Sequence, residues 1–92
     1  MMNADLIHKA LANPLRRDIL AWLKRTESPF GPGLPINAIQ ARSGLSQSTV
    51  SAHVAAMIKA GLLVATPVGQ FVVLSRNEDV IGAFIRDMRE RL

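Results

Sequence analysis

The amino-acid sequence predicts a mostly α-helical fold with one small β-hairpin. Three observations lead to this fold class. Apolar residues recur at intervals of three and four in several segments, which is typical of helices with one buried side. Two runs of β-branched and aromatic residues flank a glycine near residue 70, which predicts a hairpin. Of the 92 residues 49% are hydrophobic, so we expect a single domain over residues 1–92 with a real core.

Composition restricts the kinds of partner that the chain can have. Lys and Arg total 11 against 7 Asp and Glu, which gives a net charge of +4. A basic surplus suits nucleic acid, because neutralising phosphates supplies much of the affinity, although it also simply keeps a domain soluble. Cysteine is absent, which excludes disulfides and thiolate metal ligands. Neither a secretion signal nor an apolar run of the roughly 18 residues that span a bilayer is present, so we expect a cytoplasmic protein.

Two helices are expected before residue 26. The first covers residues 4–11, and the second covers residues 14–25, with Asn13 as its N-cap and Pro14 at its first position. Trp22 lies on the apolar stripe of the second helix, which favours a core residue over one that stacks on a base.

Residues 26–35 are expected to be a loop. Three prolines and two glycines in these ten residues argue against regular structure. Phe30 is either a plug at the edge of the core, which we favour, or an exposed contact. Pro35 is placed to open the next helix.

The stretch from residue 35 to residue 63 has the pattern of a helix-turn-helix. Ile36 and Ile39 mark the inner side of a first helix, and residues 44–46 form the corner. The second helix begins after Ser46, a good N-cap, and ends at Gly61. The second helix of such a motif is shaped to enter the major groove of DNA.

The second helix divides into an apolar side and a small polar side. Its inward positions are Val50, Val54, Met57 and Ile58, and the opposite side carries Ser48, Ala52, Ala55, Ala56 and Lys59. Small side chains permit close approach to a groove floor. Near the start of the helix, Gln47 suits adenine, and hydroxyls such as those of Ser48 and Ser51 suit bases or phosphates. The free N–H groups of the first turn suit a phosphate as well.

Three further residues border this helix. His53 projects between core and surface, and we favour a structural role for it over a DNA contact. A role as metal ligand is the least favoured, because no second ligand follows at helical spacing. Arg42 and Lys59 are expected to flank the groove and touch phosphates; the alternative is that they are solvated surface charges.

A hairpin and a last helix complete the predicted fold. Residues 62–66 and 71–74 read as strands joined by a turn at residues 67–70, which makes a wing directly after the second helix. The wing has no basic residue, so minor-groove contact should be weak and limited to the backbone or Gln70. Asn77 caps the last helix, which carries a broad apolar stripe.

Three segments resemble the ArsR/SmtB family of bacterial winged-helix transcriptional repressors. They are L-A-N-P-L-R-R-D-I-L at residues 11–20, S-G-L-S-Q-S-T-V-S-A-H-V at residues 43–54 and K-A-G-L-L-V at residues 59–64. The resemblance implies four helices, two strands and a fifth helix in that order. It also implies a homodimer whose two recognition helices enter successive major grooves of a palindromic operator on double-stranded DNA. Arg16 matches the family motif and either touches the DNA backbone or pairs with Asp18 or Glu27.

The residues expected to act in this way form two sets. The candidate DNA-binding residues are Arg16, Arg42, Ser46, Gln47, Ser48, Thr49, Ser51, Ala52, His53, Lys59 and Gln70. The candidate dimer interface, implied by the resemblance for the first and last helices, is Leu6, Ile7, Leu11, Val80, Ile81, Phe84, Ile85 and Met88.

The sequence departs from the family at its metal sites. Metal-sensing members carry Cys-x-Cys in the helix before the turn, where this chain has Pro35 and Asn37. Others use Asp and His on the last helix, where this chain has Asp79 and Asp87 but no histidine. We therefore expect no metal and no cofactor, and the inducer is left unknown.

The leading hypothesis is a DNA-binding transcriptional regulator that acts as a repressor. The alternative is a winged helix that binds another protein, which the uncharged wing favours. An enzyme is not expected, because the chain has no catalytic triad order, no phosphate-binding glycine loop and no carboxylate pair with a reason to be perturbed.

Overall fold

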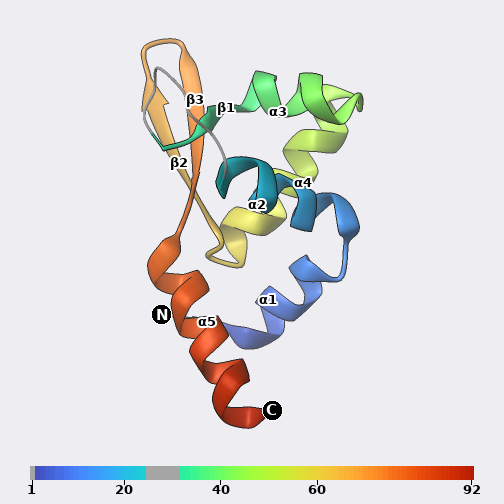
Figure 1. Cartoon of the computed structure of the whole chain (residues 1–92). Coiled ribbons are helices and arrows are strands. Elements are labelled where there is room, and N and C mark those ends of the chain that lie inside the picture. Colours follow the sequence, from blue (N-terminus) through green and yellow to red (C-terminus); the bar gives the residue numbers. More distant parts are fainter. Residues whose placement is uncertain (1, 25–31) are drawn as a thin grey trace.

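The computed structural model describes residues 2–24 and 32–92 (Figure 1). These residues form α1 (Ala4–Leu11), α2 (Pro14–Lys24), β1 (Leu34–Pro35), α3 (Ile36–Ser43), α4 (Gln47–Lys59), β2 (Leu63–Val68), β3 (Phe71–Arg76) and α5 (Glu78–Arg91). The arrangement confirms the predicted fold class, a mostly helical chain with a hairpin wing. Three residues that entered the predictions lie outside the described residues: Arg25 as a helix end, Glu27 as a partner for Arg16, and Phe30 as a core plug.

The helices begin where the sequence places caps. Ser46 and Asn77 act as the predicted caps: a side-chain oxygen of each accepts a backbone N–H from the first turn of α4 and α5. Asn3, which had not been named as a cap, does the same for α1. These bonds satisfy N–H groups that have no partner within the helix. The local signals therefore placed the beginnings of these three helices correctly.

The last two residues of the predicted loop, residues 34 and 35, form a strand instead. Leu34 and Pro35 form β1, which pairs antiparallel with β3, and the sheet has the order β1-β3-β2. Gly33 makes this approach possible, since a Cβ at that position would lie 2.5 Å from the carbonyl oxygen of Leu74. The pairing partner is about 40 positions further along the chain, so the local pattern of proline and glycine did not reveal the strand.

The hairpin strands are longer than predicted. Pro67 and Val68 belong to β2 rather than to the turn, and only Gly69 and Gln70 separate the strands. Gly69 has a φ of 59°, a left-handed conformation that favours glycine in such a tight turn. Pro67 is tolerated because β2 is an edge strand, where one N–H of the ladder can be absent.

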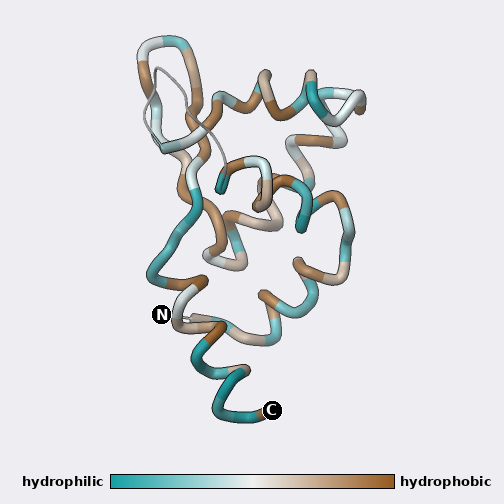
Figure 2. The backbone as a smooth tube through the Cα atoms, in the orientation of Figure 1, coloured by the Kyte–Doolittle hydropathy of each residue, from teal (hydrophilic) through white to brown (hydrophobic). Residues whose placement is uncertain are grey.

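The apolar residues form two core clusters. The first joins α2, α3 and α4 to the sheet around Ile19, Ile39, Met57 and Leu74. The second lies between α1 and the end of α4, around Ile7, Ala10, Ala60 and Leu62, and residues of α5 pack on its outer side. Figure 1 shows α1 and α5 side by side at the end of the molecule opposite the hairpin. Figure 2 shows that the last turns of α5 are mainly hydrophilic.

No residue of α5 is buried, although the helix carries the predicted apolar stripe. Val80, Ile81 and Phe84 are partly covered by the second cluster, and the Ile85 side chain is among the exposed large hydrophobics at 48%. Ile7, which the resemblance assigned to the dimer interface, is fully buried within the chain. Ile7 therefore packs beneath the predicted α1–α5 dimer interface and has no exposed surface that a second copy could contact.

Candidate nucleic-acid interface

The corner between α3 and α4 is fixed by one glycine and one serine. Gly44 ends α3 in the left-handed conformation with a φ of 71°, and its N–H donates to the carbonyl of Gln40. The Ser43 hydroxyl donates to the same carbonyl at 2.8 Å and accepts the N–H of Leu45 at 3.1 Å. These local bonds set the direction in which α4 leaves the turn.

The start of α4 is held by a serine–threonine pair. The Ser46 hydroxyl accepts the backbone N–H of Thr49 at 3.3 Å and donates to the Thr49 hydroxyl oxygen at 2.8 Å. The Ser46 and Ser48 hydroxyl oxygens lie 3.3 Å apart. Ser46 and Thr49 were both predicted to contact DNA, and the structure places their hydroxyl groups in the helix cap.

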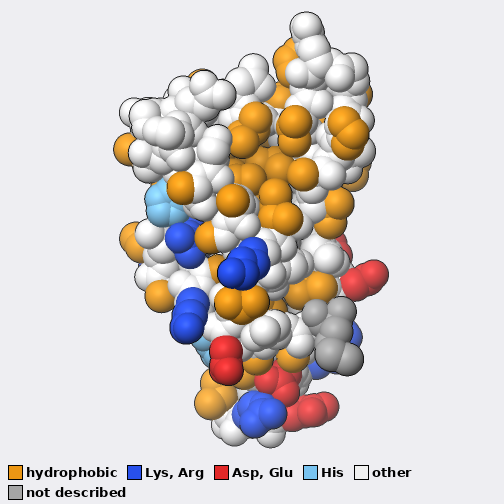
Figure 3. Space-filling model, turned by 180° about the vertical axis from the view of Figure 1, so that it is seen from behind, with side chains coloured by type: hydrophobic (Ala, Val, Ile, Leu, Met, Phe, Trp, Pro, Cys, Tyr) orange, Lys and Arg blue, Asp and Glu red, His pale blue; other side chains and the backbone are white. Residues whose placement is uncertain are grey.

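The outward face of α4 is small and free of charge over its first two turns. Gln47, Ser48, Ser51 and Ala52 are all exposed, whereas Val50, Val54 and Met57 are buried. The prediction that Ile58 packs inward is wrong, since its side chain is 39% exposed. Figure 3 shows a wide apolar area on the back of the molecule, with Lys and Arg side chains below it and a His side chain at its left edge.

His53 and Arg16 are brought together from α4 and α2. The Arg16 Nε–H donates to His53 Nδ1 at 3.1 Å, and both residues are half-buried. Neither ion pair among the described residues involves Arg16, so the suggested partner Asp18 does not hold it. Because 37 positions separate the two residues, the sequence offered no signal for this contact.

Arg42 lies against a second helix. Its guanidinium carbon is 5.0 Å from the centre of the Trp22 ring, a distance at which a cation is attracted to an aromatic face. Trp22 is half-buried and packs on the first core cluster, as the sequence predicted. Arg42 was predicted to flank the groove. Its contact with the Trp22 ring holds the guanidinium close to α2.

The wing carries an apolar outer surface. The exposed fractions of Val64, Val68 and Val72 are 43%, 40% and 44%, and Gln70 is exposed at the turn. No charged residue occurs from Leu62 to Ser75. Any wing contact with DNA must therefore come from polar or backbone groups.

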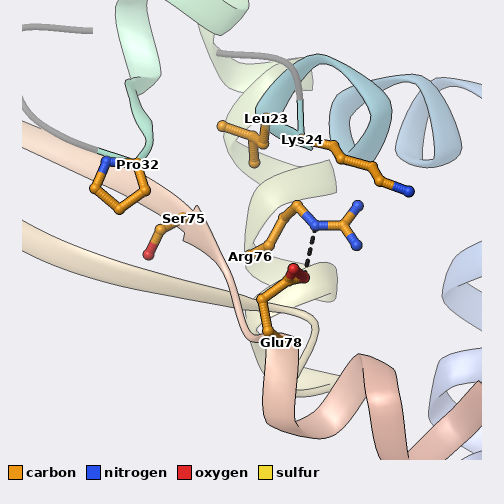
Figure 4. A pocket seen from close by; sticks show the side chains of 6 residues that line it. All are labelled: Leu23, Lys24, Pro32, Ser75, Arg76 and Glu78. Carbon is orange, nitrogen blue, oxygen red and sulfur yellow. Dashed lines mark hydrogen bonds and ion pairs between the residues drawn. The ribbon is translucent and has the colours of Figure 1, made fainter. Parts of the chain in front are cut away.

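Arg76, the last residue of β3, is the first cation after Lys59, and its side chain points into the molecule. Its Nε–H donates to Glu78 at 2.8 Å, its Nη1–H donates to the carbonyl of Leu20 at 3.2 Å, and its side chain is only 16% exposed. Arg76 and Glu78 line a cavity of about 280 Å³ with Leu23, Lys24, Pro32 and Ser75 (Figure 4). Sequence reasoning gave Arg76 no role, and the structure shows that it ties α2 to the base of β3.

Metal-type ligands are dispersed among the described residues. No three His, Asp or Glu side chains gather there into a possible metal site. His8 packs edge-on against Phe84, with ring centres 5.1 Å apart, and His53 contacts Arg16. Within the same described ranges, no helix has the length and apolar character needed to cross a membrane.

Comparison with known proteins places this geometry in a family. Residues 13–64, more than half of the chain, match the model of a family described as winged helix-turn-helix DNA-binding. The chain is 32% identical over 85 residues to the uncharacterized HTH-type transcriptional regulator YbzH of Bacillus subtilis (strain 168), covering 83% of this chain and 85% of that protein.

Solved structures give the same result. The homodimeric DNA-binding domain of Mb0332 from Mycobacterium bovis, a possible ArsR-family transcriptional regulator, is similar with a TM-score of 0.73 and 27% identity, covering 95% of this chain and 76% of that chain. An ArsR-like regulator from Rhodococcus sp. RHA1 shares the fold with a TM-score of 0.79 at 18% identity, with 95% and 76% covered. The chain therefore belongs to the winged helix-turn-helix DNA-binding family of transcriptional regulators, and its fold is similar to that of ArsR-type regulators.

Proposed function

We propose that the chain acts in the cytoplasm as a homodimeric repressor that binds a palindromic operator and blocks transcription. The observation that carries the proposal is the exposed face of α4, which presents Gln47, Ser48, Ser51 and Ala52 on a helix with a capped start. A face of this size and polarity fits the floor of a major groove.

The proposed contacts divide between bases and phosphates. Gln47 reads a base edge, where its amide matches adenine, and Ser48, Ser51 and Ala52 allow close approach. Phosphates are neutralised by the cations around the helix, Arg16, Arg42 and Lys59. Gln70 adds a weak contact from the wing. Base contacts then supply the sequence preference and the cations supply the salt-dependent affinity.

The proposed dimer forms through α1 and α5, with residues 1–92 acting as one domain. Its support is the half-exposed apolar surface of Leu6, Leu11, Val80, Ile81, Phe84, Ile85 and Met88. The similar domain of Mb0332 is a homodimer. A second copy would cover the α5 stripe, and it would place two α4 helices about one DNA turn apart.

A fluorescence anisotropy titration tests the proposal against the upstream region of the protein's own gene and a random duplex. We expect binding to the upstream duplex at least about 10³-fold tighter, with affinity falling steeply as salt rises. Nuclease protection should show two half-sites related by symmetry, and purified polymerase should initiate less often once they are occupied. Equal affinity for the two duplexes would contradict the proposal.

A second function, docking of another protein, is favoured by the uncharged wing. Val64, Val68 and Val72 form an exposed apolar surface where a DNA-binding wing would profit from cations. If the protein works in this way, Arg42→Ala and Gln47→Ala leave DNA binding unchanged, whereas Val72→Asp abolishes the protein complex.

A further inference from the structure

The contact between Arg16 and His53 has a defined direction. Arg16 Nε carries a hydrogen and can only donate, so His53 Nδ1 accepts and carries no proton in this geometry. The histidine is therefore the neutral tautomer with its hydrogen on Nε2. The charge of Arg16 is consequently held by a neutral partner and is not cancelled.

Arg16 keeps free donors in this arrangement. The bond to His53 uses only Nε–H, and a guanidinium has four further N–H groups on its two terminal nitrogens. Among the described residues, Arg16 makes no other hydrogen bond and no ion pair. By contrast, Arg76 uses two of its nitrogens within the chain. Arg16 can thus still offer paired donors to an anion.

The position of His53 decides where these donors lie. In the α4 helix, His53 follows the exposed Ala52 and lies one turn after Thr49, so it borders the outward face on the side that packs against α2. A phosphate next to a groove occupied by α4 would meet the Arg16 guanidinium on this side of the helix.

We propose that His53 is a positioning residue, which fixes the Arg16 guanidinium beside the recognition helix so that its free N–H groups bind a DNA phosphate. The inference rests on the proposed function, since it assumes that α4 enters a groove. It assigns His53 a task that a histidine filling the edge of the core would not have. Without the acceptor, the arginine side chain must be ordered at the moment of binding, which weakens the contact.

The test compares four variants on a selected upstream duplex and on a random duplex, each titrated at several salt concentrations. Arg16→Gln removes the charge, and we expect the slope of log affinity against log salt to become shallower by about 0.9. His53→Leu removes only a neutral acceptor, yet we expect roughly threefold to tenfold weaker binding and a shallower slope, because Arg16 no longer holds the phosphate.

Two conservative variants separate positioning from charge or packing. His53→Asn retains an acceptor at the δ1 position and should restore the slope and most of the affinity. Arg16→Lys keeps the charge but loses the Nε–H donor and the fork, so it should behave like His53→Leu. It also leaves α4 unaltered and therefore remains informative if His53→Leu does not fold, which circular dichroism and thermal unfolding would reveal.

The outcomes distinguish this inference from the proposed function. If folded His53→Leu and Arg16→Lys bind both duplexes with the slope of the original protein, the positioning role is overturned while the regulator stands. If His53→Asn fails as badly as His53→Leu, the acceptor is not what matters and the inference is again overturned. If the original protein binds the upstream and random duplexes equally, the proposed specificity fails, but the slopes on random DNA still decide the role of His53.

Discussion

At the scale of single residues, polar side chains around α4 divide into those that build the helix and those that are free to bind. Ser46 and Thr49 bond to one another across the first turn. The side chains of Gln47 and Ser51 are exposed and make no hydrogen bond to the described residues. Residue type alone did not separate these groups, because a hydroxyl at a helix start suits a cap and a DNA contact equally well.

Ser46→Ala removes the cap of α4. We expect the free energy of unfolding to fall by about 1 kcal/mol, since a backbone N–H loses its acceptor. Urea denaturation measures the change. Ser51→Ala is the matched control, because it removes an exposed hydroxyl from the same helix and should alter stability by less than about 0.5 kcal/mol. A Ser46→Ala protein as stable as this control would show that the cap contributes nothing.

Gln47→Ala should change recognition without changing stability. An amide that reads adenine is worth about 1–3 kcal/mol of discrimination, so we expect roughly 10-fold or greater loss of affinity for the selected operator. Binding to random DNA should be unaffected, because Gln47 carries no charge. Anisotropy on both duplexes measures the two affinities, and a parallel loss on random DNA would argue against base reading.

At the scale of elements, the helices were more predictable than the sheet. Asn3, Ser46 and Asn77 signal helix starts within a few residues of sequence. β1 has no such signal, because its two residues become a strand only through their pairing with β3. The same limit applies to the site: the exposed face of α4 follows from helical periodicity, whereas the contacts of Arg16 with His53 and of Arg42 with Trp22 depend on how helices pack.

Gly33→Ala tests the close approach of β1 to β3. A Cβ placed 2.5 Å from the Leu74 carbonyl oxygen cannot be accommodated without a shift of backbone, so we expect a loss of about 2 kcal/mol in unfolding free energy. Gly82→Ala is the comparison. Its Cβ would meet only the flexible end of Arg86 within the chain, at 3.4 Å, and alanine favours a helix. Thermal unfolding of both variants checks the difference, and equal midpoints would contradict it.

At the scale of the whole molecule, α5 extends away from the main core, and the molecule measures 41 × 25 × 20 Å. The second cluster covers only the beginning of the α5 stripe. A chain of this size buries a modest part of its surface, so a partner copy at α1 and α5 would add stability as well as a second reading helix.

Ile85→Glu is expected to separate the dimer. The side chain is 48% exposed in the single chain, so a charge there is tolerated by the monomer but is costly within an apolar interface. Light scattering coupled to size exclusion should report half the mass, and operator affinity should fall together with it. Glu90→Gln, an exposed substitution on the same helix, serves as control. A dimer that survives Ile85→Glu would place the interface elsewhere.

The proline in the edge strand of the wing has a consequence for solubility. β2 is the outer strand of a hairpin that carries exposed valines and no charge, which is the kind of edge that invites another chain to add a strand. Pro67 lacks an N–H and interrupts the row of donors near the hairpin end of β2. We expect Pro67→Val to aggregate at lower concentration than the original protein, as measured by static light scattering, whereas Pro67→Lys should not. Pro67, which was predicted to be part of the turn, thus prevents the uncharged edge strand β2 from pairing with strands of other molecules.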